Sequence, residues 1–162
     1  MTLFILHVAA TLFMTGLVWF VQIVHYPLLH RVGTAGFSRY ELEHTRRTSP
    51  VVAPMMLFEL GSGVWLALVP PVGVQSALLL ANAVLLAIIW GSTFVLQSPL
   101  HRSLASGVAA GSVERLVSTN WIRTASWSVR SVLLLLVLLP MTEPPPPAPA
   151  PPEATQTLPP MQ

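Results

Sequence analysis

The segment Asn120 to Arg130, NWIRTASWSVR, constrains the rest of the chain, because the run SVLLLLVLL follows it at 131–139. A run of nearly pure Leu and Val predicts a helix that lies in lipid. Arg130 would then lie about 14 Å along the helix from Trp121, at ~1.5 Å per residue. A guanidinium at this depth costs at least ~2.5–3.5 kcal/mol unless another group compensates for it. The sequence therefore predicts a partner for Arg130 on another helix.

The composition agrees with a membrane protein. Only 9% of the 162 residues are charged and the mean hydropathy is +0.67, which is too apolar for an ordinary soluble domain. The basic residues are eight arginines, and there is no cysteine. The chain therefore has no disulfides, no thiolate metal sites and no cysteine nucleophile. A net charge of only +2, without a basic and aromatic patch, argues against a nucleic-acid partner.

Apolar stretches along the chain predict an all-α fold, a bundle of four transmembrane helices with the lipid bilayer as its partner. We expect the spans at about 3–29, 50–69, 76–97 and 121–139. Together they form one membrane domain over residues 1–141. The first span should end near Pro27 and the third at Ser98-Pro99, because proline cannot donate a backbone hydrogen bond. The Pro-rich residues 142–162 predict a disordered, extended tail.

A short interfacial helix is predicted before the second span. The S-x-x-E sequence that begins at Ser38 has the form of a capping box, which favours a helix over about 39–48. Ser49-Pro50 then combines a good N-cap with a proline at the first helical position. We therefore expect a new helix to begin at Pro50, with short interfacial helices on the cytoplasmic side of the bundle.

The arginines also predict the orientation. The connections 30–49 and 98–123 hold seven of the eight arginines. By the positive-inside rule both connections face the cytoplasm. The expectation is an integral membrane protein of a bacterial-type inner membrane, with its N- and C-termini outside the cytoplasm.

Glu59 in the second span is the predicted partner of Arg130. Both residues lie about 14 Å from the cytoplasmic start of their helices, so we expect them to pair or to share a polar cavity. Arg123, Trp127 and Arg130 share one helix face by their i, i+4, i+7 spacing. A charge inside a membrane indicates function, but polar groups also hold helices in register. Both interpretations stay open at this point.

The first and third spans each carry their polar residues on one stripe. These are His7, Thr11, Gln22 and His25 on the first span, and Asn82, Trp90, Thr93 and Gln97 on the third. Only His7 lies far from the cytoplasmic side, where the other four histidines, His25, His30, His44 and His101, are expected. Imidazoles from different helices could hold haem iron or another His-ligated metal. No pair has a strong metal-binding spacing, so hydrogen bonds to water, lipid or neighbours are the alternative, and the cofactor stays unknown.

Three segments resemble a known family. QIVHYPLL at 22–29, QSPLHRSL at 97–104 and LVSTNWIRTASWSVR at 116–130 are similar to the pattern of small four-helix membrane proteins grouped with anthrone oxygenases. Members of that family with an assigned function are implicated in oxidising flat polycyclic substrates. The resemblance implies that the site is lined by His25, Gln97, His101, Asn120, Arg123 and Arg130.

A fainter resemblance is to the haem-binding membrane oxidases of the protoporphyrinogen type. In those proteins an early histidine and a G-x-x-W/Y step precede a basic connection that contains a glutamate and an arginine. The comparable residues here are His7, Gly16, Trp19, Phe37, Glu41 and Arg46.

These observations predict a membrane oxidoreductase or oxygenase-like protein that acts on a lipophilic small molecule. Arg123 and Arg130 would bind an anionic or carbonyl oxygen, with Glu59 orienting Arg130. His25 and His101 would transfer protons or ligate a metal. The remaining expected site residues, on the cofactor side, are Gln22, Gln97, Asn120 and Trp127. The alternative is a non-catalytic accessory or structural subunit of a membrane complex, and a homodimer is also compatible with the sequence.

Overall fold

A computed structural model describes residues 1–107 and 111–141, and within these ranges the protein is helical and has no strands. The predicted disordered tail, 142–162, lies outside the described residues. The elements in chain order are the α-helix α1 (Thr2–Phe20), the π-helix η1 (Val21–His25), α2 (Tyr26–Leu28), the 3-10 helix η2 (Leu29–Arg31), α3 (Thr34–Leu68), α4 (Ser76–Ser92), the π-helix η3 (Thr93–Gln97), α5 (Ser98–Ser106) and α6 (Ser112–Met141).

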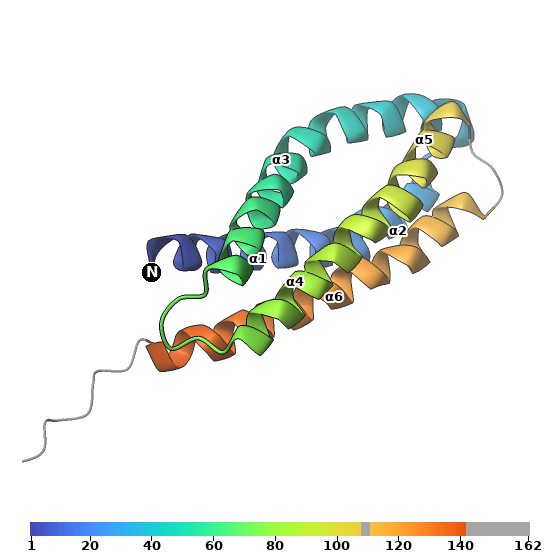
Figure 1. Ribbon diagram of the computed structural model, residues 1–162. Coiled ribbons are helices and arrows are strands. Elements are labelled where there is room, and N and C mark those ends of the chain that lie inside the picture. The colour runs from blue at the N-terminus through green and yellow to red at the C-terminus, as the bar shows by residue number, and fades with distance from the viewer. Residues whose placement is uncertain (108–110, 142–162) are drawn as a thin grey trace, which may run out of the picture.

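These elements join into long rods that pack side by side (Figure 1). Four helical stretches, Thr2–Arg31, Thr34–Leu68, Ser76–Ser106 and Ser112–Leu139, are long and apolar enough to cross a membrane. The helix α6 packs against both α1 and α4, and α3 packs against α1, α4 and α5. The all-helical prediction is therefore confirmed, with four candidate membrane spans.

The two Arg-rich connections lie at the same end of the bundle. Figure 1 shows residues 31–34, the end of α5 and the start of α6 at one end. The start of α1, the 69–75 loop and the end of α6 lie at the opposite end. The charged and the uncharged connections are thus separated by the length of the helices.

The predicted start of a new helix at Pro50 is wrong. The helix α3 begins at Thr34 and continues through Pro50 and Pro54 to Leu68, so residues 39–48 are part of it and not a separate interfacial helix. A proline removes one hydrogen bond and bends a helix without always ending it, and α3 is visibly curved in Figure 1. Burial of Phe37 against apolar residues of α2 and α5 holds the first half of α3 in place.

The first helical stretch passes Pro27 and ends at Arg31, two residues beyond the predicted end at 29, whereas the predicted break at Ser98-Pro99 is absent. A π-helix precedes each proline. In η1 the N–H of Tyr26 donates to the carbonyl of Val21, five residues back, and Ser98 does the same with Thr93 in η3. The wider turn moves the preceding carbonyls away from the proline ring, which would clash with them in a regular α-helix. The chain therefore stays helical through both prolines.

The interior alternates between apolar and polar layers. Three apolar clusters lie along the bundle, and α6 contributes to each. Leu134 lies in a cluster with Phe4 of α1, Trp127 with Met14 of α1, and Leu116 with Tyr26 of α2. Buried polar side chains separate these clusters at two levels along the bundle. One level contains Thr11 and Arg130, and the other contains Gln22 and Asn120. These two polar layers are the candidate sites.

Candidate functional site

The first polar layer is built around Arg130 and confirms the predicted ion pair. Arg130 Nη1 donates to Glu59 Oε1 at 2.7 Å, and both side chains are fully buried. Arg130 Nε also donates to Asn82 Oδ1 at 3.1 Å. The Glu59 carboxylate accepts further hydrogen bonds from Thr11 Oγ1 at 2.8 Å and Trp127 Nε1 at 3.0 Å. The groups come from α1, α3, α4 and α6, so this network joins all the long helices.

His7 belongs to this layer as well. Its Nδ1 lies 2.7 Å from Ser62 Oγ and its Nε2 lies 3.4 Å from Arg130 Nη2. The sequence predicted that His7 lies at the opposite end of its span from the other histidines, and the structure places it apart from His25, His44 and His101. The contact of His7 with Arg130 was not predicted.

The second polar layer lies nearer the Arg-rich end and starts from α6. Asn120 Nδ2 donates to Gln22 Oε1 at 2.8 Å, and Arg123 Nη1 donates to Asn120 Oδ1 at 3.2 Å. The Arg123 guanidinium carbon lies 5.2 Å from the centre of the Trp127 ring. Trp127 therefore contacts Arg123 on one side and, through its N–H, the Glu59 carboxylate on the other. The predicted polar face of α6 is confirmed.

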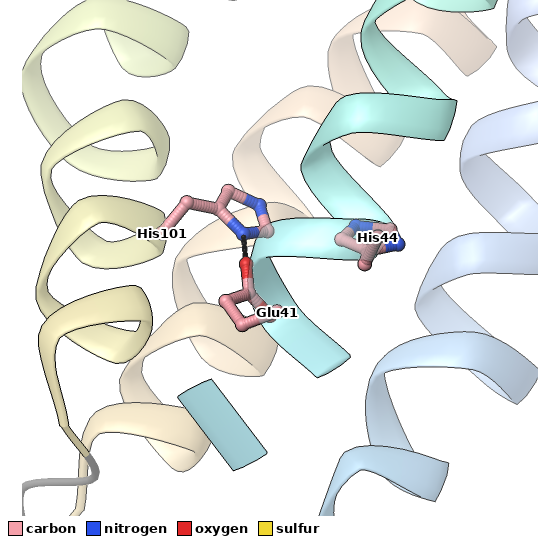
Figure 2. A group of neighbouring side chains, drawn as sticks. All are labelled: Glu41, His44 and His101. Atoms are coloured by element: carbon pink, nitrogen blue, oxygen red, sulfur yellow. Dashed lines mark hydrogen bonds and ion pairs between the residues drawn. The ribbon is translucent and has the colours of Figure 1, made fainter. Parts of the chain in front are cut away.

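A cluster of histidines around Glu41 completes the second layer (Figure 2). His101 Nδ1 lies 2.5 Å from Glu41 Oε1, and its other ring nitrogen, Nε2, lies 2.9 Å from the Tyr26 hydroxyl. His44 Nδ1 is 3.0 Å from His25 Nε2, and the two rings stack with their centroids 4.5 Å apart. The gathering of His25, His44 and His101 at the Arg-rich end is therefore confirmed, whereas His30 is exposed.

Glu41 and His44 were missed as site residues by sequence reasoning. Glu41 was interpreted as a capping residue, since it ends an S-x-x-E sequence. The signal that could have found it is E-x-x-H, Glu41 followed by His44, which places a carboxylate and an imidazole on one face of a helix. That face is buried because α3 is already helical at this position and packs on α5.

A cavity of about 290 Å³ lies beside the histidine cluster. Most of its wall is apolar and includes Met14, Val18, Val52 and Met56. Ser49, Ala53 and Phe94 also line it and are exposed on the outside of the bundle, so the cavity opens on the side where α3 faces η3. Besides Ser49, the polar part of the wall consists of Tyr26, His44, Thr45, Thr48, Trp90, Thr93, Gln97, Ser98, His101 and Arg123.

Several buried polar atoms in this region have no hydrogen-bond partner among the described residues. They are Glu41 Oε2, Trp90 Nε1, Gln97 Oε1 and Arg123 Nε. Leaving a buried donor or acceptor without a partner costs about 1–3 kcal/mol. Trp90, Gln97 and Arg123 all line the cavity, so the residues of its wall carry two N–H donors and one amide-oxygen acceptor without a partner among the described residues.

The predicted site residues thus divide into three groups. Gln97, His101 and Arg123 line the cavity. His25 contacts the cavity residue His44, while Gln22, Asn120 and Trp127 are buried in contact with Arg123 or its neighbours. Glu59 and Arg130 are in the first layer and are not part of the cavity wall. Their predicted part in catalysis has no support from this geometry and stays a prediction.

Comparison of the chain with protein-family models, with curated proteins and with solved structures found no match in any of the three. The resemblances to anthrone-oxygenase-like proteins and to haem-binding membrane oxidases therefore stay predictions.

Proposed function

We propose that the chain is a membrane-embedded oxidoreductase or oxygenase-like protein that acts on a flat lipophilic molecule carrying a carbonyl or phenolic oxygen. The observation that carries the proposal is the cavity, which combines an apolar wall, an opening on the apolar outside of the bundle and a polar end with free donors. Its volume of about 290 Å³ is at the small end of the ~300–1,000 Å³ typical of ligand sites.

The position of the opening supports a substrate that arrives from the bilayer. The cavity reaches the surface at Ala53 of α3 and Phe94 of η3, within helical stretches that are apolar enough to cross a membrane. A molecule dissolved in the acyl chains would meet this opening without passing through water. The arginines gathered at one end of the bundle support the proposed orientation, in which that end faces the cytoplasm of a bacterial-type cell and both termini lie outside.

The polar end of the cavity supports binding of an oxygen atom followed by proton transfer. Arg123 Nε and Trp90 Nε1 would donate hydrogen bonds to that oxygen, and charge that develops on it would be stabilised by the guanidinium. An ionised carboxylate can only accept hydrogen bonds, so Glu41 orients His101 with Nδ1 as donor and Nε2 as acceptor for Tyr26. His101 and Tyr26 both line the cavity and would exchange a proton with the bound molecule.

The test measures binding of a hydroxyanthraquinone, chosen as a flat lipophilic probe, to the full chain in lipid nanodiscs. Binding is monitored through the quenching of tryptophan fluorescence. Ala53→Phe blocks the opening and is expected to weaken binding at least tenfold. Ala87→Phe is the matched control, since Ala87 is exposed on α4 and is not part of the cavity wall. Equal affinity for the wild-type protein and Ala53→Phe would show that the cavity is not the binding site. Turnover is followed as oxygen uptake after addition of the reduced anthrone form of the probe.

The competing proposal is a non-catalytic subunit of a membrane complex. It is supported by the Arg130 layer, which ties α1, α3, α4 and α6 together without reaching the cavity. This proposal expects no probe binding and expects another subunit to co-purify with the protein from native membranes.

A further inference from the structure

We propose that Glu41, His44 and His101 bind a divalent first-row transition-metal ion at the polar end of the cavity. One carboxylate oxygen and one nitrogen from each imidazole all lie within 4.8 Å of one another. The inference rests on the proposed function, because it assigns a metal cofactor to the same cavity. His44 and His101 both line that cavity.

The donors have the composition of a known class of metal site. Two histidines and one carboxylate on one side of an ion leave its other positions open, as in mononuclear non-haem Fe(II) oxygenases. Glu41 and His44 are three residues apart and so project from the same face of α3, and His101 reaches them from α5 (Figure 2). The ligands are thus presented by two packed helices, which fixes their approach before an ion arrives.

The distances require a small adjustment. Ligand atoms that bind one ion at ~2.0–2.2 Å lie about 3–3.6 Å apart. The three ligand atoms lie within 4.8 Å of one another, so side-chain rotation must shorten any of these separations that exceeds the coordinated range. The Glu41–His101 contact, at 2.5 Å, must lengthen instead. The ion would replace the proton shared by these two groups, and a proton is released when a metal displaces it in this way.

A second observation points to a cation at this position. Glu41 is fully buried, and its Oε2 has no hydrogen-bond partner among the described residues. Glu59, the other fully buried glutamate in the described ranges, pairs with Arg130 and has two further donors. The ion-pairing partner of Glu41 is instead His101, which is charged only when it is protonated. A divalent ion would provide the positive charge that this carboxylate otherwise lacks.

Neighbouring side chains hold the proposed ligands in orientation. His25 Nε2 and Thr48 Oγ1 contact His44 Nδ1 at 3.0 and 3.2 Å. The Tyr26 hydroxyl likewise contacts His101 Nε2 at 2.9 Å. Hydrogen bonds of this kind to metal-binding histidines fix the ring and typically change metal affinity by about 10–100-fold when they are removed.

The experiment uses the full chain in nanodiscs, freed of metal with a chelator and titrated with Co²⁺ alone. Cobalt is chosen because its visible absorption bands report nitrogen and oxygen ligands. We expect saturation at one ion per chain, with affinity lowered at least ~100-fold in Glu41→Gln and in His101→Gln. His25→Ala should weaken binding by about 10-fold through His44. The matched control is His30→Ala, because His30 is exposed at the same end and contacts Glu114 instead; its affinity should be unchanged.

A measurement on the wild-type protein covers the case in which the ligand variants do not fold. Bound Co²⁺ shifts the proton NMR signals of its ligands, and two exchangeable imidazole signals are expected. Absence of saturable Co²⁺ binding, fewer than two such signals, or equal affinity in folded Glu41→Gln would overturn the metal site. Probe binding with no metal binding would remove this inference and leave the proposed function. Metal binding with no probe binding would leave the metal site and overturn the proposed function.

Discussion

Replacement of Arg130 by methionine should be the most damaging single change in the described part of the chain. The substitution leaves the Glu59 carboxylate fully buried with only Thr11 and Trp127 as donors. Removing one partner of a buried ion pair costs about 3–5 kcal/mol, because the other charge stays uncompensated. The side-chain oxygen of Asn82, Oδ1, also loses its hydrogen bond from Arg130 Nε, which should cost a further ~1 kcal/mol. We therefore expect a loss of about 4–6 kcal/mol in the free energy of unfolding.

The pairing is tested by a double-mutant cycle. Glu59→Gln alone should cost about 3–5 kcal/mol, since it leaves the buried Arg130 guanidinium without its counter-charge. The double variant, Arg130→Met with Glu59→Gln, should lose no more than the worse single variant. The coupling energy would then be about 3–5 kcal/mol.

The free energy of unfolding is measured by titration with a denaturing detergent in mixed micelles, with helix content followed by circular dichroism. Arg115→Met is the control, since Arg115 is exposed on the same helix and surface changes usually stay within about 0.5 kcal/mol. Strictly additive losses in the two single variants would refute the reasoning, because independent sites add.

Three smaller changes test the packing around this layer, with the same unfolding measurement. Gly63→Ala should cost about 1–3 kcal/mol, because an added Cβ would lie 3.0 Å from Leu86 Cδ2. Gly61→Ala is the control, since nothing lies within 4 Å of that position, and it should be neutral or stabilise the protein by up to ~1 kcal/mol. Equal effects of the two substitutions would contradict the packing. Trp127→Phe should cost about 1.5–3 kcal/mol, since it removes the N–H donor to a carboxylate at 3.0 Å and keeps most of the ring; no loss would mean that this bond is unimportant. Thr15→Val, which removes the 2.7 Å contact with Ser131, should cost ~0.6 kcal/mol, the average for such bonds between membrane helices, and a loss above ~2 kcal/mol would indicate a larger rearrangement.

The local breaks in the helices were the part of the fold that sequence reasoning predicted least well. Proline was taken to end a helix at Pro27 and Pro99 and to begin one at Pro50, and the chain is helical through all three. Each proline removes one backbone hydrogen bond from its helix, and the helix continues through it nevertheless. At Pro27 and Pro99 the π-helices remove the steric conflict as well.

The candidate site was predicted in part. Gln97, His101 and Arg123 were expected from their stripes on the helices, and they do line one cavity. Glu41 was assigned to a helix cap, because a glutamate in S-x-x-E fits a cap and a helix face equally well. The choice between the two depended on whether the helix extends back to Thr34, and packing against α2 and α5 decided that.

From the sequence alone, the number of apolar helices, the Arg-rich end of the bundle and the pairing of Glu59 with Arg130 could be derived. The helices follow from the lengths of the apolar stretches, and the Arg-rich end follows from the positions of the arginines between them. The pairing follows from the cost of a charge at a given depth in lipid, which depends on the residue and on its distance along its own helix. The tertiary structure alone determined that the polar groups form two separate layers, and that Glu41, His44 and His101 converge beside a cavity. Contacts between these side chains depend on the curvature of α3 and on the rotation of each helix against its neighbours. Packing between residues far apart in the chain sets both.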